Sequence, residues 1–152
     1  MLLCPGSPDT RRAVRAGLAA SAPTVLTPHS GELGRLLGVE SRWVDEHRLE
    51  ALERAVERFD CVVVLKGSGT LVGAPGQGAL VCRGWRTLAT AGTGDVLGGI
   101  VGSFLSKRMD ARLAAAAAVT AHTEAARRVD QQEGLVASDV VEALPRVLHA
   151  SV

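Results

Sequence analysis

The stretch Cys61-Val62-Val63-Val64-Leu65 decides the fold, because it is an unbroken apolar run between Asp60 and Lys66. Runs of this kind are typical of a strand that is covered on both faces. Around it, apolar residues recur at helical spacing over residues 45–59 and again over residues 95–107. A buried strand between helices predicts a layered α/β domain, with helices on both faces of one sheet.

Shorter signals predict the remaining elements. Gly38 is a residue type that ends helices, and Asp110 is one that caps their beginning. Pro75-Gly76-Gln77-Gly78 separates two short apolar stretches, which indicates a hairpin. The length of 152 residues suits a single domain spanning residues 1–152. The other predicted elements are a strand at 24–26, hairpin strands at 70–74 and 79–82, and helices at 10–20, 32–37, 110–129 and from Ser138 onwards.

The composition excludes several classes of function. With 17 basic and 16 acidic residues, the net charge is only +1, which is too little for a protein that binds a nucleic-acid backbone. Two Trp, two Phe and no Tyr also offer few rings on which single-stranded bases could stack. Cys4, Cys61 and Cys82 form no C-x-x-C pair, so we expect neither a disulfide framework nor a zinc site.

Nothing in the sequence predicts export or insertion into a membrane. The stretch Met1-Leu2-Leu3-Cys4-Pro5-Gly6 lacks the charged flank of a signal peptide. The apolar run Ala114–Ala118 is interrupted well before it reaches the roughly 20 residues that a membrane span needs. Together with the unpaired cysteines, these features predict a cytoplasmic protein without a membrane partner.

The segment Thr90-Ala91-Gly92-Thr93-Gly94-Asp95 is the strongest candidate for a functional site. Its two glycines let the backbone turn tightly and approach a ligand, and the helix that follows directs free N–H groups at an anion. Asp95 falls in the first helical turn, where a carboxylate can simply cap the helix. The functional alternative is that Asp95 accepts a hydroxyl proton during phosphoryl transfer.

A second candidate is Lys66-Gly67-Ser68-Gly69-Thr70, which directly follows the buried strand. Ligands of open α/β sheets bind at the carboxyl ends of the strands, so Lys66 could pair with a phosphate and Thr70 could bind a nucleotide. The pattern G-x-x-x-x-G-K-[ST] of a Walker loop is absent. The alternative is a solvated lysine in a turn.

The third candidate is Thr27-Pro28-His29-Ser30-Gly31-Glu32. Ser30 and Glu32 are ordinary residues for the start of a helix, and a lone histidine such as His29 is more often incidental than catalytic. Taken by itself, this segment therefore leaves a structural and a functional interpretation open.

Taken in this order, the three segments resemble the C-terminal part of the ADP/ATP-dependent NAD(P)H-hydrate dehydratase family, whose members are ribokinase-like enzymes. The family's T-P-H-P-G-E is matched by Thr27–Glu32, its V-V-L-K-G-x-G-T by Val63–Thr70, and its L-A-T-x-G-T-G-D-V-L by Leu88–Leu97. The first of these is the most discriminating, since G-T-G-D occurs in the wider ribokinase-like group. The similarity covers about Thr24 to Ala126 and implies a ribokinase-like layered sheet.

The resemblance implies a reaction, in which hydrated nicotinamide nucleotides, NAD(P)HX, are repaired. The terminal phosphoryl group of ADP or ATP would pass to the hydrate hydroxyl, with Mg²⁺ offsetting charge, and loss of phosphate would restore NAD(P)H. Asp95 would be the catalytic base, His29 and Asp95 would bind the substrate, and the Gly92-Thr93-Gly94 amides would form an anion hole. No protein residue is assigned as a metal ligand. The residues that would bind the adenine nucleotide are Lys66, Gly67, Ser68, Gly69, Thr70 and Gly94.

The sequence also departs from the family pattern. Ser30 replaces a proline, and Arg83-Gly84-Trp85-Arg86 stands where the family often carries an Asn/Pro-containing stretch. The family's N-terminal half is not matched, so we expect a C-terminal portion of the domain without its first strands. Such a sheet would expose an apolar edge, which predicts a homo-oligomer.

Two other functions stay open at this stage. One is a ribokinase-like kinase for a vitamin or another small molecule, which the T-P-H-x-G-E element disfavours. The other is a non-catalytic remnant that binds an adenine nucleotide. The sequence does not distinguish ADP from ATP, nor does it show whether an epimerase domain or partner exists.

Overall fold

One mixed sheet organises the protein. The structure is a computed structural model that describes residues 2–3 and 23–149, and within them five strands pair in the order β1-β2-β3-β4-β5. The first three strands are parallel, and the last two run antiparallel to their neighbours. The strands are β1 Leu2–Leu3, β2 Val25–Leu26, β3 Val62–Leu65, β4 Gly69–Ala74 and β5 Gln77–Arg83.

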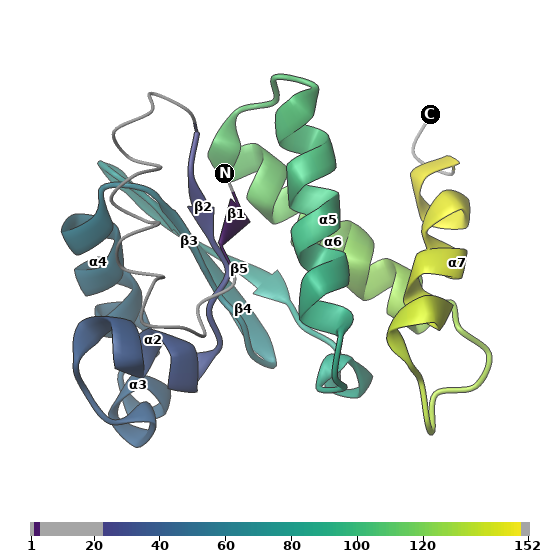
Figure 1. The fold of residues 1–152 in the computed structure, drawn as a ribbon, viewed down its shortest axis with the longest axis horizontal. Coiled ribbons are helices and arrows are strands. Elements are labelled where there is room, and N and C mark those ends of the chain that lie inside the picture. The colour runs from purple at the N-terminus through teal and green to yellow at the C-terminus, as the bar shows by residue number, and fades with distance from the viewer. Residues whose placement is uncertain (1, 4–22, 150–152) are drawn as a thin grey trace.

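Helices cover both faces of this sheet, as the sequence predicts. In Figure 1, α2, α3 and α4 lie on one side of the strands and α5 and α6 on the other, with α7 packed outside α6. The helix predicted over residues 10–20 falls outside the described residues. The helices are α2 Ser30–Leu37, α3 Ser41–Glu46, α4 Arg48–Phe59, α5 Thr93–Ser106, α6 Ala111–Arg127 and α7 Ala137–His149, with a 3-10 turn, η1, at Arg86–Leu88.

The strand β3 is buried on both faces, which explains its unbroken apolar sequence. Val63 and Leu65 belong to one hydrophobic core together with Leu52 of α4. Val62 and Val64 belong to a second core together with α5 and α6. Since successive side chains of a strand point to opposite faces, alternate residues of one strand serve two cores.

The predicted helix over residues 45–59 is confirmed over Arg48–Phe59, but its predicted start is wrong. The structure divides this region into α3 and α4, because His47 leaves the helical conformation with φ −128° and ψ 47°. Its N–H still donates to the Trp43 carbonyl at 2.9 Å, and its ring stacks on Trp43. The apolar spacing continues across the break and therefore hides it. The consequence is that α4 begins at Arg48, close to the end of β3.

The predicted hairpin is confirmed, but its turn is tighter than predicted. Only Pro75-Gly76 lie between β4 and β5, and Gly76 has a φ of 68°. The cap at Asp110 and the helix end at Gly38, which has a φ of 79°, are also confirmed.

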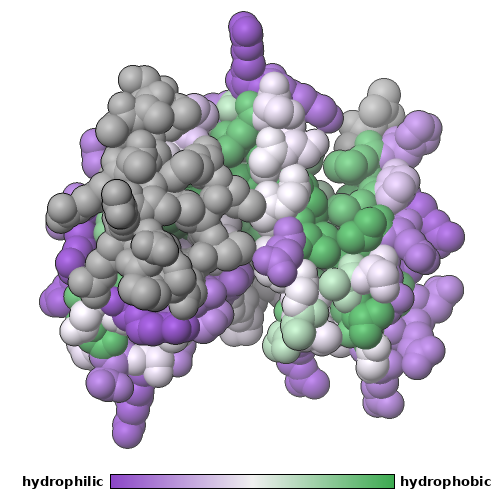
Figure 2. All heavy atoms as spheres, viewed as in Figure 1, coloured by the Kyte–Doolittle hydropathy of each residue, from purple (hydrophilic) through white to green (hydrophobic). Residues whose placement is uncertain are grey.

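The helix α7 adds a third hydrophobic core, which it forms with α6. Figure 2 shows hydrophobic residues on the face of the molecule where α5 and α7 lie next to each other. Within residues 2–3 and 23–149, no helix is both long and apolar enough to cross a membrane.

Removing the cap of α6 is expected to destabilise the protein. The Asp110 carboxylate accepts hydrogen bonds from the N–H groups of Arg112 and Leu113 at 3.1 and 3.0 Å. Asp110→Ala should therefore lower the free energy of unfolding in urea by about 1 kcal/mol. Glu40 precedes α3 without such a bond, so Glu40→Ala should change it by less than about 0.5 kcal/mol. Equal losses in the two variants would contradict this role of Asp110.

Candidate functional site

A cavity of about 650 Å³ lies at the carboxyl end of β3, and the three predicted segments meet there. Its walls come from the start of α2, the loop after β3, the segment before α5 and the middle of α6. Of the predicted site residues, Gly69 does not line it. Those that do are His29, Lys66, Gly67, Ser68, Thr70, Gly92, Thr93, Gly94 and Asp95.

His29 is the N-terminal cap of α2. Its Nδ1 accepts hydrogen bonds from the N–H groups of Gly31 and Glu32 at 3.1 and 3.3 Å. In return, the Glu32 carboxylate accepts from the His29 N–H at 2.8 Å, which completes a capping box. An accepting Nδ1 places the proton of the neutral ring on Nε2. Ser30, a residue type that often caps helices, instead donates its hydroxyl to Asp45.

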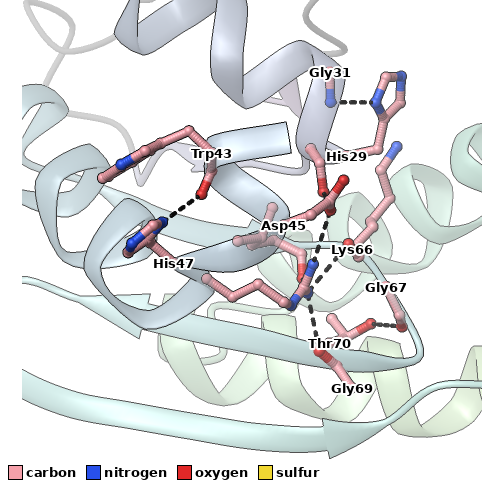
Figure 3. Close-up of polar contacts among 12 residues, drawn as sticks. His29, Gly31, Trp43, Asp45, His47, Lys66, Gly67, Gly69 and Thr70 are labelled. Carbon is pink, nitrogen blue, oxygen red and sulfur yellow. Dashed lines mark hydrogen bonds and ion pairs between the residues drawn. The ribbon is translucent and has the colours of Figure 1, made fainter. Parts of the chain in front are cut away.

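Glu32 connects this cap to Lys66, although sequence reasoning assigned Glu32 no role in the site. Its Oε2 lies 3.5 Å from the Lys66 ammonium, and its Oε1 lies 3.6 Å from Nε2 of His29. In Figure 3 the Lys66 side chain extends from the end of β3 towards His29. The ammonium also lies 3.2 Å from where a Cβ on Gly94 would stand, so it reaches the start of α5. A positive charge is thus held between two helix beginnings.

The start of α5 combines a left-handed glycine with free backbone amides. Gly92 precedes the helix in the left-handed conformation, with a φ of 84°. The hydroxyl oxygen of the buried Thr93 lies 2.6 and 2.7 Å from the carbonyl oxygens of Leu88 and Thr90, which share its one proton, and this fixes the preceding turn. Among the described residues, the amides of Gly92 and Gly94 have no hydrogen-bond partner. Free amides and the positive end of a 14-residue helix favour a phosphate at this position.

Arg48 supports the loop after β3 from the side of α4. Its Nη2 lies 3.1, 3.3 and 3.0 Å from the carbonyl oxygens of Leu65, Lys66 and Gly69. Within the same loop, the Thr70 hydroxyl donates to the Gly67 carbonyl at 3.0 Å. The Thr70 proton is therefore engaged inside the loop, and its oxygen is left to accept from a ligand. No motif in the sequence pointed to Arg48, because the contact joins residues about 20 positions apart.

His122 of α6 is the second residue that sequence reasoning missed. It lines the cavity, is only 6% exposed, and its Nε2 has no hydrogen-bond partner among the described residues. Burial lowers the pKa of His122 to about 4. A hydrogen bond to the Thr93 backbone acts in the opposite direction, and the charge of Lys66 lowers it further. The ring is therefore neutral at neutral pH. A lone histidine in an alanine-rich helix carries no sequence signal of this.

Residues 13–146 match the family model described as NAD(P)H-hydrate dehydratase. Among curated proteins, a bifunctional NAD(P)H-hydrate repair enzyme of Coxiella burnetii is 40% identical over 120 residues, which are 76% of this chain and 25% of that protein. An ADP-dependent (S)-NAD(P)H-hydrate dehydratase of Neisseria meningitidis is 41% identical over 114 residues, covering 74% of this chain and 38% of that protein. The chain thus spans about a quarter of the first relative's length.

Solved structures agree with these matches. The ADP/ATP-dependent NAD(P)H-hydrate dehydratase of Bacillus subtilis, co-crystallised with ATP and Mg²⁺, superposes with a TM-score of 0.79 at 31% identity. The superposition covers 84% of this chain and 48% of that one. Solved members of the wider ribokinase-like group share the same architecture, which confirms the predicted fold.

Arg48 is expected to stabilise the protein through the loop it supports. Methionine has a similar length but donates no hydrogen bond, so Arg48→Met leaves carbonyls of the loop without this partner. We expect a loss of about 1–3 kcal/mol in the free energy of unfolding and faster amide exchange over residues 66–70. Arg42 pairs with Glu46 at the surface, and Arg42→Met should change the stability by less than about 0.5 kcal/mol. Unchanged amide exchange over residues 66–70 in Arg48→Met would contradict the proposal that Arg48 supports this loop.

His122 is expected to make stability depend on pH in the acid range. In the unfolded chain histidine titrates near pH 6.5, whereas folded His122 takes up a proton only near pH 4. Between these values the unfolded chain binds more protons. The contribution of neutral His122 to the free energy of unfolding is therefore complete above pH 6.5, and it is lost as the pH falls towards 4.

The measurement is urea unfolding between pH 7 and pH 4.5 in the wild type and in His122→Gln. We expect the slope of stability against pH to be smaller in His122→Gln. His47→Gln changes an exposed ring and should keep the wild-type slope. Equal slopes in all three proteins would disprove the effect of His122.

Proposed function

Because the chain belongs to the NAD(P)H-hydrate dehydratase family, we propose that it restores NAD(P)H from its hydrate, NAD(P)HX, with an adenine nucleotide as phosphoryl donor. The observation that carries the proposal is the meeting of three segments in one cavity, where a lysine, a helix start and two carboxylates face the same space. The ADP dependence of the Neisseria meningitidis relative and the ATP in the Bacillus subtilis crystals support the nucleotide.

The nucleotide is assigned to the loop after β3 and to the start of α5. Lys66 supplies a positive charge for a phosphate, and its ammonium already lies beside Gly94. The Glu32 carboxylate lies 3.5 Å from this ammonium and keeps the Lys66 side chain in place. A bound phosphate would then be a second anionic partner of Lys66. The residues proposed to bind the nucleotide are Lys66, Gly67, Ser68, Gly69, Thr70 and Gly94.

The reacting phosphoryl group is assigned to the anion hole of Gly92, Thr93 and Gly94. The amides of Gly92 and Gly94 are the better placed donors, because the Thr93 amide already donates to the Thr90 carbonyl at 3.4 Å. Donors fixed before the reaction stabilise developing negative charge without reorganisation. The hydroxyl of Thr93 contributes by holding this turn in shape.

The hydrated nicotinamide is assigned to His29 and Asp95, which line the cavity. Asp95 accepts the proton of the hydrate hydroxyl as that oxygen bonds to the terminal phosphorus and the nucleoside phosphate leaves. Phosphate then departs from the ring carbon, a proton is lost from the neighbouring carbon, and the double bond of the reduced nicotinamide is restored. His29 carries its proton on Nε2 and can donate it to the substrate.

A magnesium ion fits this arrangement as a companion of the nucleotide. The carboxylates that line the cavity are those of Glu32 and Asp95. In the described part of the chain, no cluster of three or more His, Cys, Asp and Glu residues could hold a metal. Mg²⁺ is commonly bound by one or two carboxylates together with nucleotide phosphates. Since Asp95 is assigned to proton transfer, Glu32 is the residue that would hold the ion together with the phosphates, and the ion would offset phosphate charge.

We also propose a cytoplasmic location and self-association. Cys61 and Cys82 are free thiols, which suits a reducing compartment. The edge strand β5 exposes 76% of Val81, which supports contact with a second copy.

The proposed activity is tested by adding hydrated NADH, Mg²⁺ and either ADP or ATP to the purified protein. We expect recovery of the near-ultraviolet absorbance of reduced nicotinamide with at least one nucleotide. Asp95→Asn removes the proton acceptor and should lower the rate about 10²- to 10⁴-fold. Asp60→Asn is the matched control, since Asp60 lies at the opposite end of β3 with a φ of 45° that asparagine tolerates.

The outcomes of this assay distinguish an active dehydratase from a family member that has lost the activity. An equal rate of recovery in the wild type and in Asp95→Asn would contradict the role of Asp95 as proton acceptor. No recovery from folded wild-type protein, with nucleotide still raising its unfolding temperature, would leave a nucleotide-binding protein without this activity.

A further inference from the structure

Trp85 lines the cavity and has no part in the roles assigned above. It follows β5 directly, within the stretch Arg83-Gly84-Trp85-Arg86 that departs from the family pattern. The residue is 39% exposed and is among the exposed large hydrophobic residues of the described chain. Exposed aromatic faces in such positions are suited to flat ligands.

Trp85 is held beside the loop that is proposed to bind the nucleotide. The Gly84 N–H donates to the Ser68 carbonyl at 2.9 Å. A Cβ on Gly84 would lie 2.4 Å from the Gly67 carbonyl oxygen, so only glycine permits this approach of the two segments. The residue after Gly84 is therefore fixed next to Gly67 and Ser68.

Gln132 and Arg127 also hold the indole of Trp85 in place. Its Nε1–H donates to the Gln132 side-chain oxygen at 2.7 Å, and the Gln132 amide donates to the carbonyls of Ala126 and Val129 at 2.9 and 2.6 Å. The guanidinium carbon of Arg127 lies 5.3 Å from the centre of the ring. Trp85 lines the cavity, whereas Arg127 does not.

We propose that Trp85 is the platform on which the purine base of the nucleotide stacks. This inference rests on the proposed function, because the loop of Lys66–Thr70 must hold the phosphates and ribose of the same nucleotide. Stacking on an aromatic ring increases the affinity for a nucleotide through the flat face of its base, and it does not depend on the hydrogen-bonding groups at the edge of the base. The bond to Gln132 and the packing of Arg127 hold the ring in one orientation, so little freedom is lost when the base binds.

The first test measures affinity by calorimetry. Trp85→Ala should raise the Kd for ADP by about 5- to 150-fold, the range expected for one base–aromatic stack. Tripolyphosphate has no base, and its Kd should be the same for both proteins. Trp85→Phe keeps a ring but loses the bond to Gln132, so its Kd for ADP should lie between those of the wild type and Trp85→Ala. If Trp85→Ala does not fold, the comparison of Trp85→Phe with the wild type tests the same stacking contact.

The second test uses the fluorescence of Trp85 itself. The protein contains two tryptophans and no tyrosine. Trp43, which packs against His47 and Arg54, is not among the residues that line the cavity. In Trp43→Phe, Trp85 is then the single indole. We expect its emission to change on titration with ADP, with a midpoint at the calorimetric Kd, and to stay constant with tripolyphosphate.

Two results would overturn the inference, and they differ in what else they reject. If ADP binds wild-type protein and Trp85→Ala with the same Kd and leaves the emission of Trp85 unchanged, the platform is rejected and the proposed nucleotide site stands. If ADP does not bind folded wild-type protein at all, the proposed function is rejected together with the platform.

Discussion

The burial of β3 on both faces is the constraint on which the rest of the structure depends. Alternate side chains of this strand enter two separate hydrophobic cores, so neither layer of helices can shift without disturbing the other. The chain emerges from this strand at Lys66, directly at the cavity. The glycine-containing loop therefore starts from a fully buried strand, and Arg48 fixes its first carbonyls.

Charge at the site is arranged around Glu32. One carboxylate closes the capping box with His29 and approaches the ammonium of Lys66, while His122 nearby is kept neutral by burial. Glu32 offsets the charge of the half-buried Lys66, and the free amides of Gly92 and Gly94 at the start of α5 still attract an anion. The protein itself thus gives Lys66 one acidic partner, and a phosphate would add a second.

Much of this could be predicted from the sequence where the signal is local. The strand at 62–65, the cap at Asp110 and the turn at Gly76 depend on residues within a few positions of each other, and each was predicted near its observed place. The break at His47 was not predicted, because the apolar spacing runs through it. The family match extends over residues 13–146, and the three short motifs that pointed to it were visible in their order along the chain without coordinates.

The sequence by itself determined the layered α/β class, the three segments of the site and the family to which they point. Only the tertiary structure decided that Glu32, His122 and Trp85 line the cavity and that Arg48 contacts its loop. The physical reason is the range of the interactions involved. Motifs and periodicity record contacts between near neighbours, whereas Arg48 meets the loop 17 to 21 residues away and Trp85 meets Gln132 47 residues away. Such contacts exist only once the sheet and its two layers have formed.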